Sequence, residues 1–210
     1  MHGLYLVTDR GLIGDRRITD VVTAAVEGGA SCVQVREKDA STRELVEIAT
    51  RLRYLLHSLG VPLIVNDRID VALAVGADGV HLGQRDMDYP TARRLLGPDA
   101  VVGLSVETME EVGQADAYDV DYLGVSPIFA TPTKRDTRGA WGLDGLARVR
   151  RRSQHPLVAI GGLDVSNAAA AVEAGADAVA VVSAICAASN PRQAAAELVA
   201  QIDAAMSARS

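Results

Sequence analysis

The sequence contains little cysteine, few aromatic side chains and no excess of positive charge. Cys32 and Cys186 are the two cysteines among 210 residues, and neither has a C-x-x-C or histidine-rich companion. They are therefore predicted to be buried thiols, and a zinc site is not expected. The formal net charge of -6 argues against a nucleic-acid or anionic-membrane partner. A local basic cluster can still bind a phosphorylated small molecule, so we expect small-molecule partners.

Long hydrophobic runs and a targeting signal are also lacking. The chain enters a strand-like run at Leu4 without a basic region, an apolar segment and a cleavage site. We therefore expect a cytoplasmic protein without a signal peptide. The most apolar tract, residues 168–189, contains Glu173 and Asp177, so it is not expected to span a membrane.

The length and composition are those of an ordinary globular chain. About half of the residues are apolar (49%) and about a quarter are charged (23%). No linker or low-complexity segment divides the 210 residues. We therefore expect one domain, residues 1–210, with a sizeable core. The sequence does not show an interface, so it leaves undecided whether the chain forms a homo-oligomer.

Short runs of Val, Ile and Leu alternate with segments of helical apolar spacing, such as residues 45–59 and 195–202. This alternation predicts eight βα units. The strand candidates are Leu4–Val7, Cys32–Val35, Leu63–Val65, Gly79–Leu82, Val101–Leu104, Tyr122–Val125, Leu157–Ile160 and Ala178–Val182.

A weak internal repeat supports a (β/α)₈ TIM barrel. Residues 27–30, 75–78 and 174–177 each end a helical pattern with glycine and lead into a strand. The length lies at the short end for a TIM barrel. An open doubly wound sheet has the same alternation, but no G-x-G-x-x-G follows the first strand, where Thr8-Asp9-Arg10 stands instead.

Basic and amide side chains follow the second strand. Period-two alternation places Gln34, Arg36 and Lys38 on one face, with Val35 and Glu37 on the other. Arginine offers a bidentate fork and lysine a point charge, which together suit a pyrophosphate. A solvated strand end is the alternative.

Acidic side chains follow the next two strands. Asn66 and Asp67 come directly after the third strand, and Asp86 follows the fourth. Carboxyl ends of parallel strands share one rim, and Mg²⁺ carrying phosphates often uses only one or two carboxylates. Asp67 is also suited to cap the helix that begins near Ile69, and Asp86 to be a solvated loop charge.

Ser105 closes the predicted fifth strand. The sequence shows no histidine and aspartate that would pair with Ser105 in a catalytic triad. A hydroxyl that orients a substrate is therefore favoured over a nucleophile. Helix capping before Thr108 is the alternative. His81 is interpreted as a packed or supporting histidine and not as a base.

The long connection after the sixth strand, residues 126–140, is a candidate binding loop. Its hydroxyl and basic side chains, Thr131, Thr133 and Lys134 among them, suit an anion, although a solvated basic loop has the same composition. Phe129 and Trp141 are expected to plug the barrel mouth.

Small residues end the last two strands. Gly162 follows the seventh strand, and Val182 and Ser183 close the eighth. In TIM barrels this pair of loops frequently binds phosphate through backbone N–H groups. A tight turn that needs small residues is the alternative.

In order along nearly the whole chain, these segments resemble the thiamine phosphate synthase (thiamine-phosphate pyrophosphorylase) family. The similar motifs are LYLVTDR, QVREKD, IVNDRIDVALAVGADGVHLGQRD, VGLSVET, DYLGVSPIFATPTKRDT, VAIGGL and AVVSAI.

The resemblance implies a Mg²⁺-dependent transferase of thiamine biosynthesis. An aminopyrimidine methyl pyrophosphate would lose pyrophosphate, and the ring nitrogen of a thiazole phosphate would attack the resulting carbon. Asp67 and Asp86 would hold Mg²⁺, and Ser105 and Lys134 would be catalytic. The substrate-binding residues would be Gln34, Arg36, Lys38, Asn66, Ser105, Thr131, Thr133, Lys134, Gly162, Val182 and Ser183.

The chain departs from the family pattern at two positions. Many relatives have histidine where Glu107 stands, and an acidic residue commonly aligns with Arg85. A related thiazole tautomerase is the nearest rival, but that enzyme lacks an intact pyrophosphate set and uses a histidine where Ser126 stands here. A barrel that binds a thiamine precursor without catalysis is a third possibility.

Overall fold

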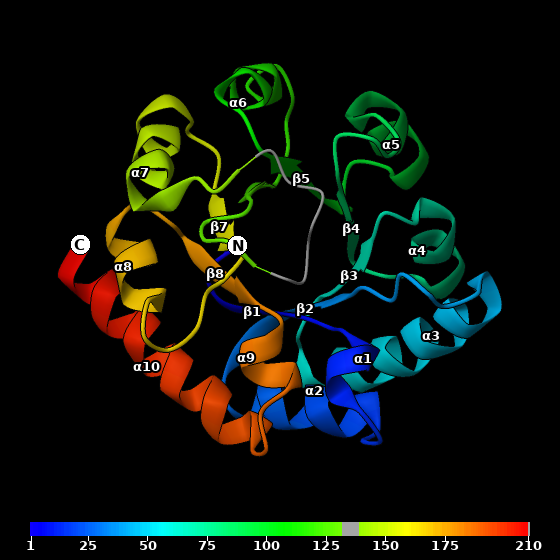
Figure 1. Cartoon of the computed structure of the whole chain (residues 1–210). Helices are drawn as coiled ribbons and strands as arrows, with labels where there is room; N and C mark the ends of the chain where they lie inside the picture. The colour runs from blue at the N-terminus through cyan, green and yellow to red at the C-terminus, as the bar shows by residue number, and fades with distance from the viewer. Residues whose placement is uncertain (132–138, 210) are drawn as a thin grey trace.

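Eight parallel strands form a closed barrel in chain order, and helices surround it (Figure 1). The computed structural model describes residues 1–131 and 139–209. The closed barrel confirms the (β/α)₈ TIM-barrel prediction and excludes the open sheet. The strands are β1 (Gly3–Val7), β2 (Ala30–Val35), β3 (Leu63–Asn66), β4 (Gly79–Leu82), β5 (Val101–Val106), β6 (Tyr122–Val125), β7 (Leu157–Ile160) and β8 (Ala178–Val181).

Pairing of the first and last strands closes the sheet. Gly3 stands opposite Ala178 and Leu6 opposite Val181 in a parallel register. Both faces of each strand are covered, one by helices and the other by the barrel lumen, so the strands read as continuous apolar runs. This double burial explains why the sequence pattern located all eight.

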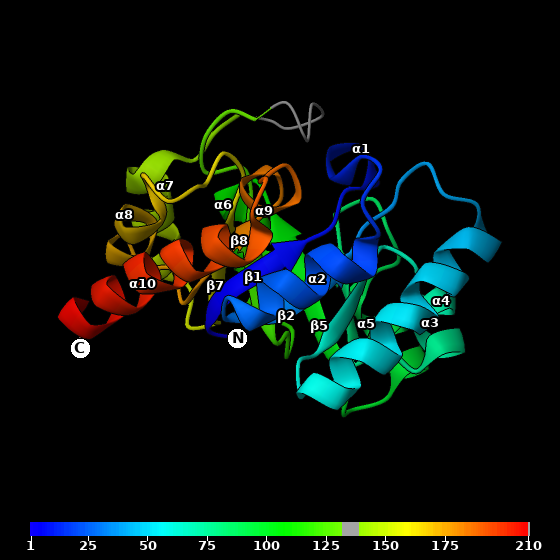
Figure 2. The ribbon, with the colours of Figure 1, turned by 90° about the horizontal axis from the view of Figure 1, so that it is seen from below.

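The helices begin and end at residues with recognisable capping chemistry. Ser41 and Glu44 form a reciprocal capping box at the start of α3, and Gly60 ends it in the left-handed conformation. Figure 2 shows α10 and α2 lying along the outside of β1. None of the helices in the described chain combines the length and apolar character needed to cross a bilayer. The helices are α1 (Arg10–Ile13), α2 (Ile18–Glu27), α3 (Thr42–Leu59), α4 (Ile69–Val75), α5 (Tyr89–Leu96), α6 (Met109–Ala115), α7 (Gly142–Arg152), α8 (Ala168–Glu173), α9 (Ser183–Cys186) and α10 (Pro191–Arg209).

Two hydrophobic clusters form the core. The larger one lies between strands and helices and includes Cys186, and the smaller one includes Tyr5, Cys32 and Tyr122. Burial raises the pKa of the Cys32 thiol to about 12 and that of Cys186 to about 11. Both cysteines are free and buried, as predicted.

The repeated glycines have the conformation that the turn requires. Gly29, Gly76 and Gly175 have φ values of 101°, 64° and 116°. A side chain is disfavoured at these angles, which explains the glycine in each copy of the turn. The three copies at 27–30, 75–78 and 174–177 therefore share a glycine with positive φ just after a helix, although the connections to the next strand differ in length.

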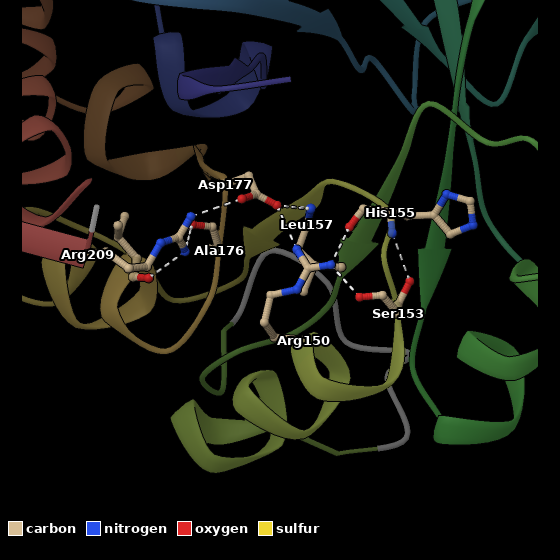
Figure 3. A network of polar contacts seen from close by, with 8 residues as sticks. Arg150, Ser153, His155, Leu157, Ala176, Asp177 and Arg209 are labelled. Carbon is tan, nitrogen blue, oxygen red and sulfur yellow. Dashed lines mark hydrogen bonds and ion pairs between the residues drawn. The ribbon is translucent and has the colours of Figure 1, made fainter. Parts of the chain in front are cut away.

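The last residue of that turn has a further role at Asp177, which links three elements at the amino-terminal end of the barrel (Figure 3). Its carboxylate accepts hydrogen bonds from the backbone N–H of Leu157 at 2.9 Å, from Arg150 at 2.9 Å and from Arg209 at 3.0 Å. Its own backbone N–H donates to the Leu157 carbonyl at 2.8 Å. Asp177 therefore joins β7, α7 and α10.

Asp78 and Asp121 repeat this arrangement just before β4 and β6. Each carboxylate accepts a hydrogen bond at 2.8 Å from a strand N–H, whose carbonyl in turn accepts from the N–H of the aspartate. The strand residues are Leu63 and Val102, and the arginines that pair with the two carboxylates are Arg53 and Arg93.

Replacing Asp177 with alanine should destabilise the fold. The change leaves the N–H of Leu157 and two partly buried arginines without their shared acceptor. We expect a loss of about 3 kcal/mol in the free energy of unfolding, measured in urea. Asp20→Ala, which breaks an exposed ion pair with Arg17, is the control and should unfold like the parent chain. Equal stability of the two variants would contradict the role given to Asp177.

Candidate active site

A cavity of about 360 Å³ opens at the carboxyl ends of the strands. TIM-barrel enzymes carry their active sites at this end. The described residues that were predicted for the site all line this cavity, namely Gln34, Arg36, Lys38, Asn66, Asp67, Asp86, Ser105, Thr131, Gly162, Val182 and Ser183. The structure thus brings together residues from the ends of seven strands, β2 to β8, and their individual roles stay predictions.

The alternation predicted after β2 is observed. Gln34, Arg36 and Lys38 line the cavity, whereas Glu37 points toward the first β-α turn. Glu37 accepts hydrogen bonds from Thr8 Oγ1 at 2.7 Å and from the Arg10 N–H at 3.2 Å. Burial raises the pKa of its carboxyl group, and these two hydrogen bonds act against the rise. Glu37 therefore anchors the segment that presents the two cations.

Asp67 has an unusual backbone conformation at the end of β3. Its φ is 61°, the only positive value at a residue other than glycine in the described chain. Such strain is typical of functional positions. The alternative role as a helix cap is wrong for Asp67, because α4 begins after Arg68 and no side chain caps its amino terminus. The backbone N–H of Asp67 instead donates to the His81 carbonyl at 2.9 Å.

Asp86 lies beside Asp67 in the cavity. A tight turn holds it, because the N–H of Gly83 donates to its carboxylate at 2.7 Å. Burial, a hydrogen bond with Asp86 and the negative charge of Asp86 together raise the pKa of Asp67 to about 6. Lys38 and Asn66 act in the opposite direction. The two carboxylates thus repel each other across a short gap that a proton or a cation would bridge.

The carboxylates of Asp67 and Asp86 suit a cation that takes only some of its ligands from the protein. Among residues 1–131 and 139–209, no group of three or more acidic, histidine or cysteine side chains forms a metal cage. Asp67 and Asp86 alone suit Mg²⁺, which takes one or two carboxylates and completes its shell with water and phosphate oxygens.

Ser105 lies within β5, which continues one residue further to Val106. Its hydroxyl is 2.8 Å from Nε2 of His81, so it does not cap α6, whose cap is Thr108. The other ring nitrogen of His81 is 3.0 Å from the hydroxyl of Tyr122. Ser105, His81 and Tyr122 thus form a series with no carboxylate among the three, and His81 has the supporting position expected for it.

The sequence interpretation missed several polar side chains of the cavity, Tyr5, Gln84 and Tyr122 among them. Tyr5 and Tyr122 form its floor, and Gln84 donates to the Ser105 carbonyl at 2.6 Å. Period-two alternation was the available signal, since Tyr5 is two residues before Val7 and Tyr122 two before Gly124, which also line the lumen side.

Small residues form the opposite wall. Gly161 and Gly162 have φ values of 103° and 67°, and a Cβ atom on Gly162 would lie 2.8 Å from Cβ of Phe129. The short helix α9 begins at Ser183 beside this turn. Among the hydrogen bonds of the described chain, none is donated by the N–H of Gly162 or Ser183. TIM barrels frequently bind phosphate through N–H groups at this place in the fold, and that role stays a prediction for Gly162 and Ser183.

The loop after β6 is described only in part. Thr131 lines the cavity, whereas Thr133 and Lys134 lie outside the described residues. Phe129 and Trp141 pack against the core between strands and helices, and the indole N–H of Trp141 donates to the Val106 carbonyl at 3.3 Å. They are core residues at the rim and do not line the cavity.

The family described as thiamine monophosphate synthase matches residues 4–185. The chain belongs to this family. A thiamine-phosphate synthase of Albidiferax ferrireducens is 58% identical over 201 residues, covering 96% of this chain and 92% of the relative. One from Leptospira biflexa is 50% identical over 198 residues, covering 92% and 94%. Membership confirms the resemblance found in the motifs and makes the chain an enzyme of the transferase class.

Solved structures agree with this assignment. The thiamine phosphate pyrophosphorylase of Pyrococcus furiosus superposes with a TM-score of 0.89 at 39% identity, covering 97% of this chain and 96% of that one. A 3-hexulose-6-phosphate synthase reaches a TM-score of 0.68 at 17% identity, covering 95% and 99%, and shares the fold alone.

Asp67→Asn should stabilise the protein in the absence of metal. The folded-state pKa of about 6 exceeds the ordinary value of 3.8, so Asp67 costs stability as pH rises through this interval, and the full cost is present above pH 6. Asparagine is neutral and tolerates positive φ. Partial solvent screening leaves an expected gain of about 1 kcal/mol at pH 7, which should vanish near pH 4.

Thermal unfolding measured across this pH range in a chelator checks the prediction. The control is Asp70→Asn, because the hydrogen bond from Arg68 lowers the pKa of Asp70. Asp70→Asn should lose stability at pH 7, a change opposite in sign to the one expected for Asp67→Asn. An Asp67→Asn protein that is less stable than the parent at pH 7 would show that the carboxylates do not repel.

Proposed function

We propose that this chain joins 4-amino-2-methyl-5-hydroxymethylpyrimidine pyrophosphate to 4-methyl-5-(2-hydroxyethyl)thiazole phosphate, with Mg²⁺, giving thiamine phosphate and pyrophosphate. The observation that supports this most strongly is the position of Asp67 and Asp86 in one cavity with Arg36 and Lys38. A pair of carboxylates beside a pair of cations is suited to a metal-bound polyphosphate.

Asp67 and Asp86 would hold the Mg²⁺ ion. When bound, this ion would stabilise the negative charge that develops on the departing pyrophosphate. The raised pKa of Asp67 supports this role, because a cation between the two carboxylates relieves the repulsion that raises it. Metal affinity should therefore fall as pH decreases below about 6, where Asp67 becomes protonated.

The chain's own side chains would bind the pyrimidine pyrophosphate. Arg36 can engage two phosphate oxygens with its planar fork, and Lys38 adds a compact positive charge. Gln34 and Asn66 carry amides at the ends of neighbouring strands, suited to the polar edge of the pyrimidine. Lys134 would steady the leaving group from the loop after β6, and Ser105 would contact the reacting centre from β5.

The thiazole phosphate would occupy the opposite wall. Gly162 and Ser183 line the cavity, and their N–H groups donate no hydrogen bond within the described chain. Backbone donors without a side chain in front of them allow close approach of a phosphate. Val182, Thr131 and Thr133 would complete this subsite, so the two phosphorylated groups would lie on separate walls with the reacting atoms between them.

Purified protein supplied with both precursors and Mg²⁺ should form thiamine phosphate and pyrophosphate in equal amounts. Chromatography of the thiamine product and an enzymatic pyrophosphate assay measure the two products independently. A chelator should stop both, and adding Mg²⁺ back should restore them. Absence of product with both substrates and Mg²⁺ present would refute the proposal.

Asp67→Ala should reduce turnover by at least about 100-fold, because it removes a carboxylate from the proposed metal site. Asp70→Ala is the matched control, since this exposed aspartate lies three residues away and pairs with Arg68. The control should retain parental activity and Mg²⁺ dependence. A near-normal rate in Asp67→Ala would exclude Asp67 as a required metal ligand.

A further inference from the structure

A continuous chain of hydrogen bonds crosses the barrel lumen beneath the cavity. Nε2 of Gln34 donates to the hydroxyl of Tyr5 at 2.9 Å, and the hydroxyls of Tyr5 and Tyr122 are 3.0 Å apart. The hydroxyl of Tyr122 is 3.0 Å from Nδ1 of His81, and Nε2 of His81 is 2.8 Å from Oγ of Ser105. Five side chains from β2, β1, β6, β4 and β5 are thereby connected.

The backbone is shaped to admit this chain. A Cβ atom on Gly103 would lie 2.1 Å from Cζ of Tyr122, and one on Gly124 would lie 2.8 Å from Cε1 of His81. The rings of His81 and Tyr122 stack with centroids 5.5 Å apart and planes 18° apart. Any side chain at position 103 or 124 would therefore displace one of the two rings.

Counting protons gives the chain a direction. An amide nitrogen only donates, and each tyrosine hydroxyl has a single proton. Tyr5 accepts from Gln34, so its own proton goes to Tyr122, because the neighbouring Cys32 sulfur is a weaker acceptor. Tyr122 must then donate to Nδ1 of His81. His81 consequently carries its proton on Nε2 and donates it to Ser105.

The last member of the chain faces the cavity. Oγ of Ser105 accepts from His81, so its own proton is available to a bound molecule. Burial raises the pKa of both Tyr5 and Tyr122 well above the usual value, so both stay protonated and the chain sets orientation without carrying charge.

We propose that Tyr122 is a positioning residue that, through His81, fixes Ser105 as a hydrogen-bond donor to an acceptor atom of the pyrimidine substrate. This inference rests on the proposed function for the identity of the substrate. The opposite orientation, with Gln34 presenting its oxygen to Tyr5, would make Ser105 an acceptor toward the substrate. The two orientations differ in the tautomer of His81 and can be told apart without any activity measurement.

The first test is the ¹⁵N NMR spectrum of histidine-labelled protein without ligands, with the His81 signals assigned by their loss in His81→Asn. We expect the neutral Nε2–H tautomer in the parent chain. In Tyr122→Phe the acceptor nitrogen loses its donor, so a mixture of tautomers is expected. An Nδ1–H tautomer or an imidazolium in the parent chain at pH 8 would overturn the proposal, whatever the activity.

The second test is a kinetic double-mutant cycle. Tyr122→Phe should lower kcat/KM for the pyrimidine substrate about tenfold and leave KM for the thiazole phosphate unchanged. If Tyr122 acts through Ser105, adding Tyr122→Phe to Ser105→Ala should cause little further loss. Tyr89→Phe, on α5 outside the cavity, is the control and should match the parent. Full additivity of the two losses would contradict the proposal, and inactivity of the parent chain would instead refute the proposed function.

Discussion

Closure of the sheet between β1 and β8 is the constraint on which the rest of the structure depends. The pairing joins segments about 175 residues apart, and its formation has an entropic cost of loop closure. Once the barrel is closed, all eight strand ends lie on one rim. Only in the closed form do residues of β2, β3 and β5 face Gly162 and Ser183 across a common cavity. In an open sheet the two walls proposed to bind phosphate groups would lie near opposite edges.

Closure also creates a lumen in which polar groups must satisfy one another. A buried hydroxyl or imidazole without a partner costs several kilocalories per mole. The described chain contains no buried side-chain nitrogen or oxygen without a hydrogen bond. Tyr5 and Tyr122 achieve this by bonding to each other and to groups that reach the cavity. The same interactions that make the polar lumen tolerable therefore also orient Ser105.

Sequence patterns were sufficient where the relevant signal is local. Runs of Val, Ile and Leu located all eight strands, and alternation placed Gln34, Arg36 and Lys38 on the cavity face. The hydrogen bonds that connect Ser105 to His81 and His81 to Tyr122 were not predicted. The bonded residues are 24 positions apart in the first pair and 41 in the second. Their association depends on barrel register and on the space left by Gly103 and Gly124, which no single segment encodes.

Carboxylates at the two ends of the barrel have opposite electrostatic surroundings. At the amino-terminal end, Asp78, Asp121 and Asp177 each pair with arginine and accept a strand N–H, so their charges stabilise the fold. At the carboxyl end, Asp67 and Asp86 adjoin each other, and Asp67 also has a strained backbone. Lys38 and Asn66 offset the repulsion between these two carboxylates only in part. A carboxylate pair that is only partly compensated is expected where a cation is to bind, because a pair fully neutralised by arginine would gain less from a metal. The aspartate–arginine contacts at the amino-terminal end thus offset the destabilising repulsion between Asp67 and Asp86 at the carboxyl end.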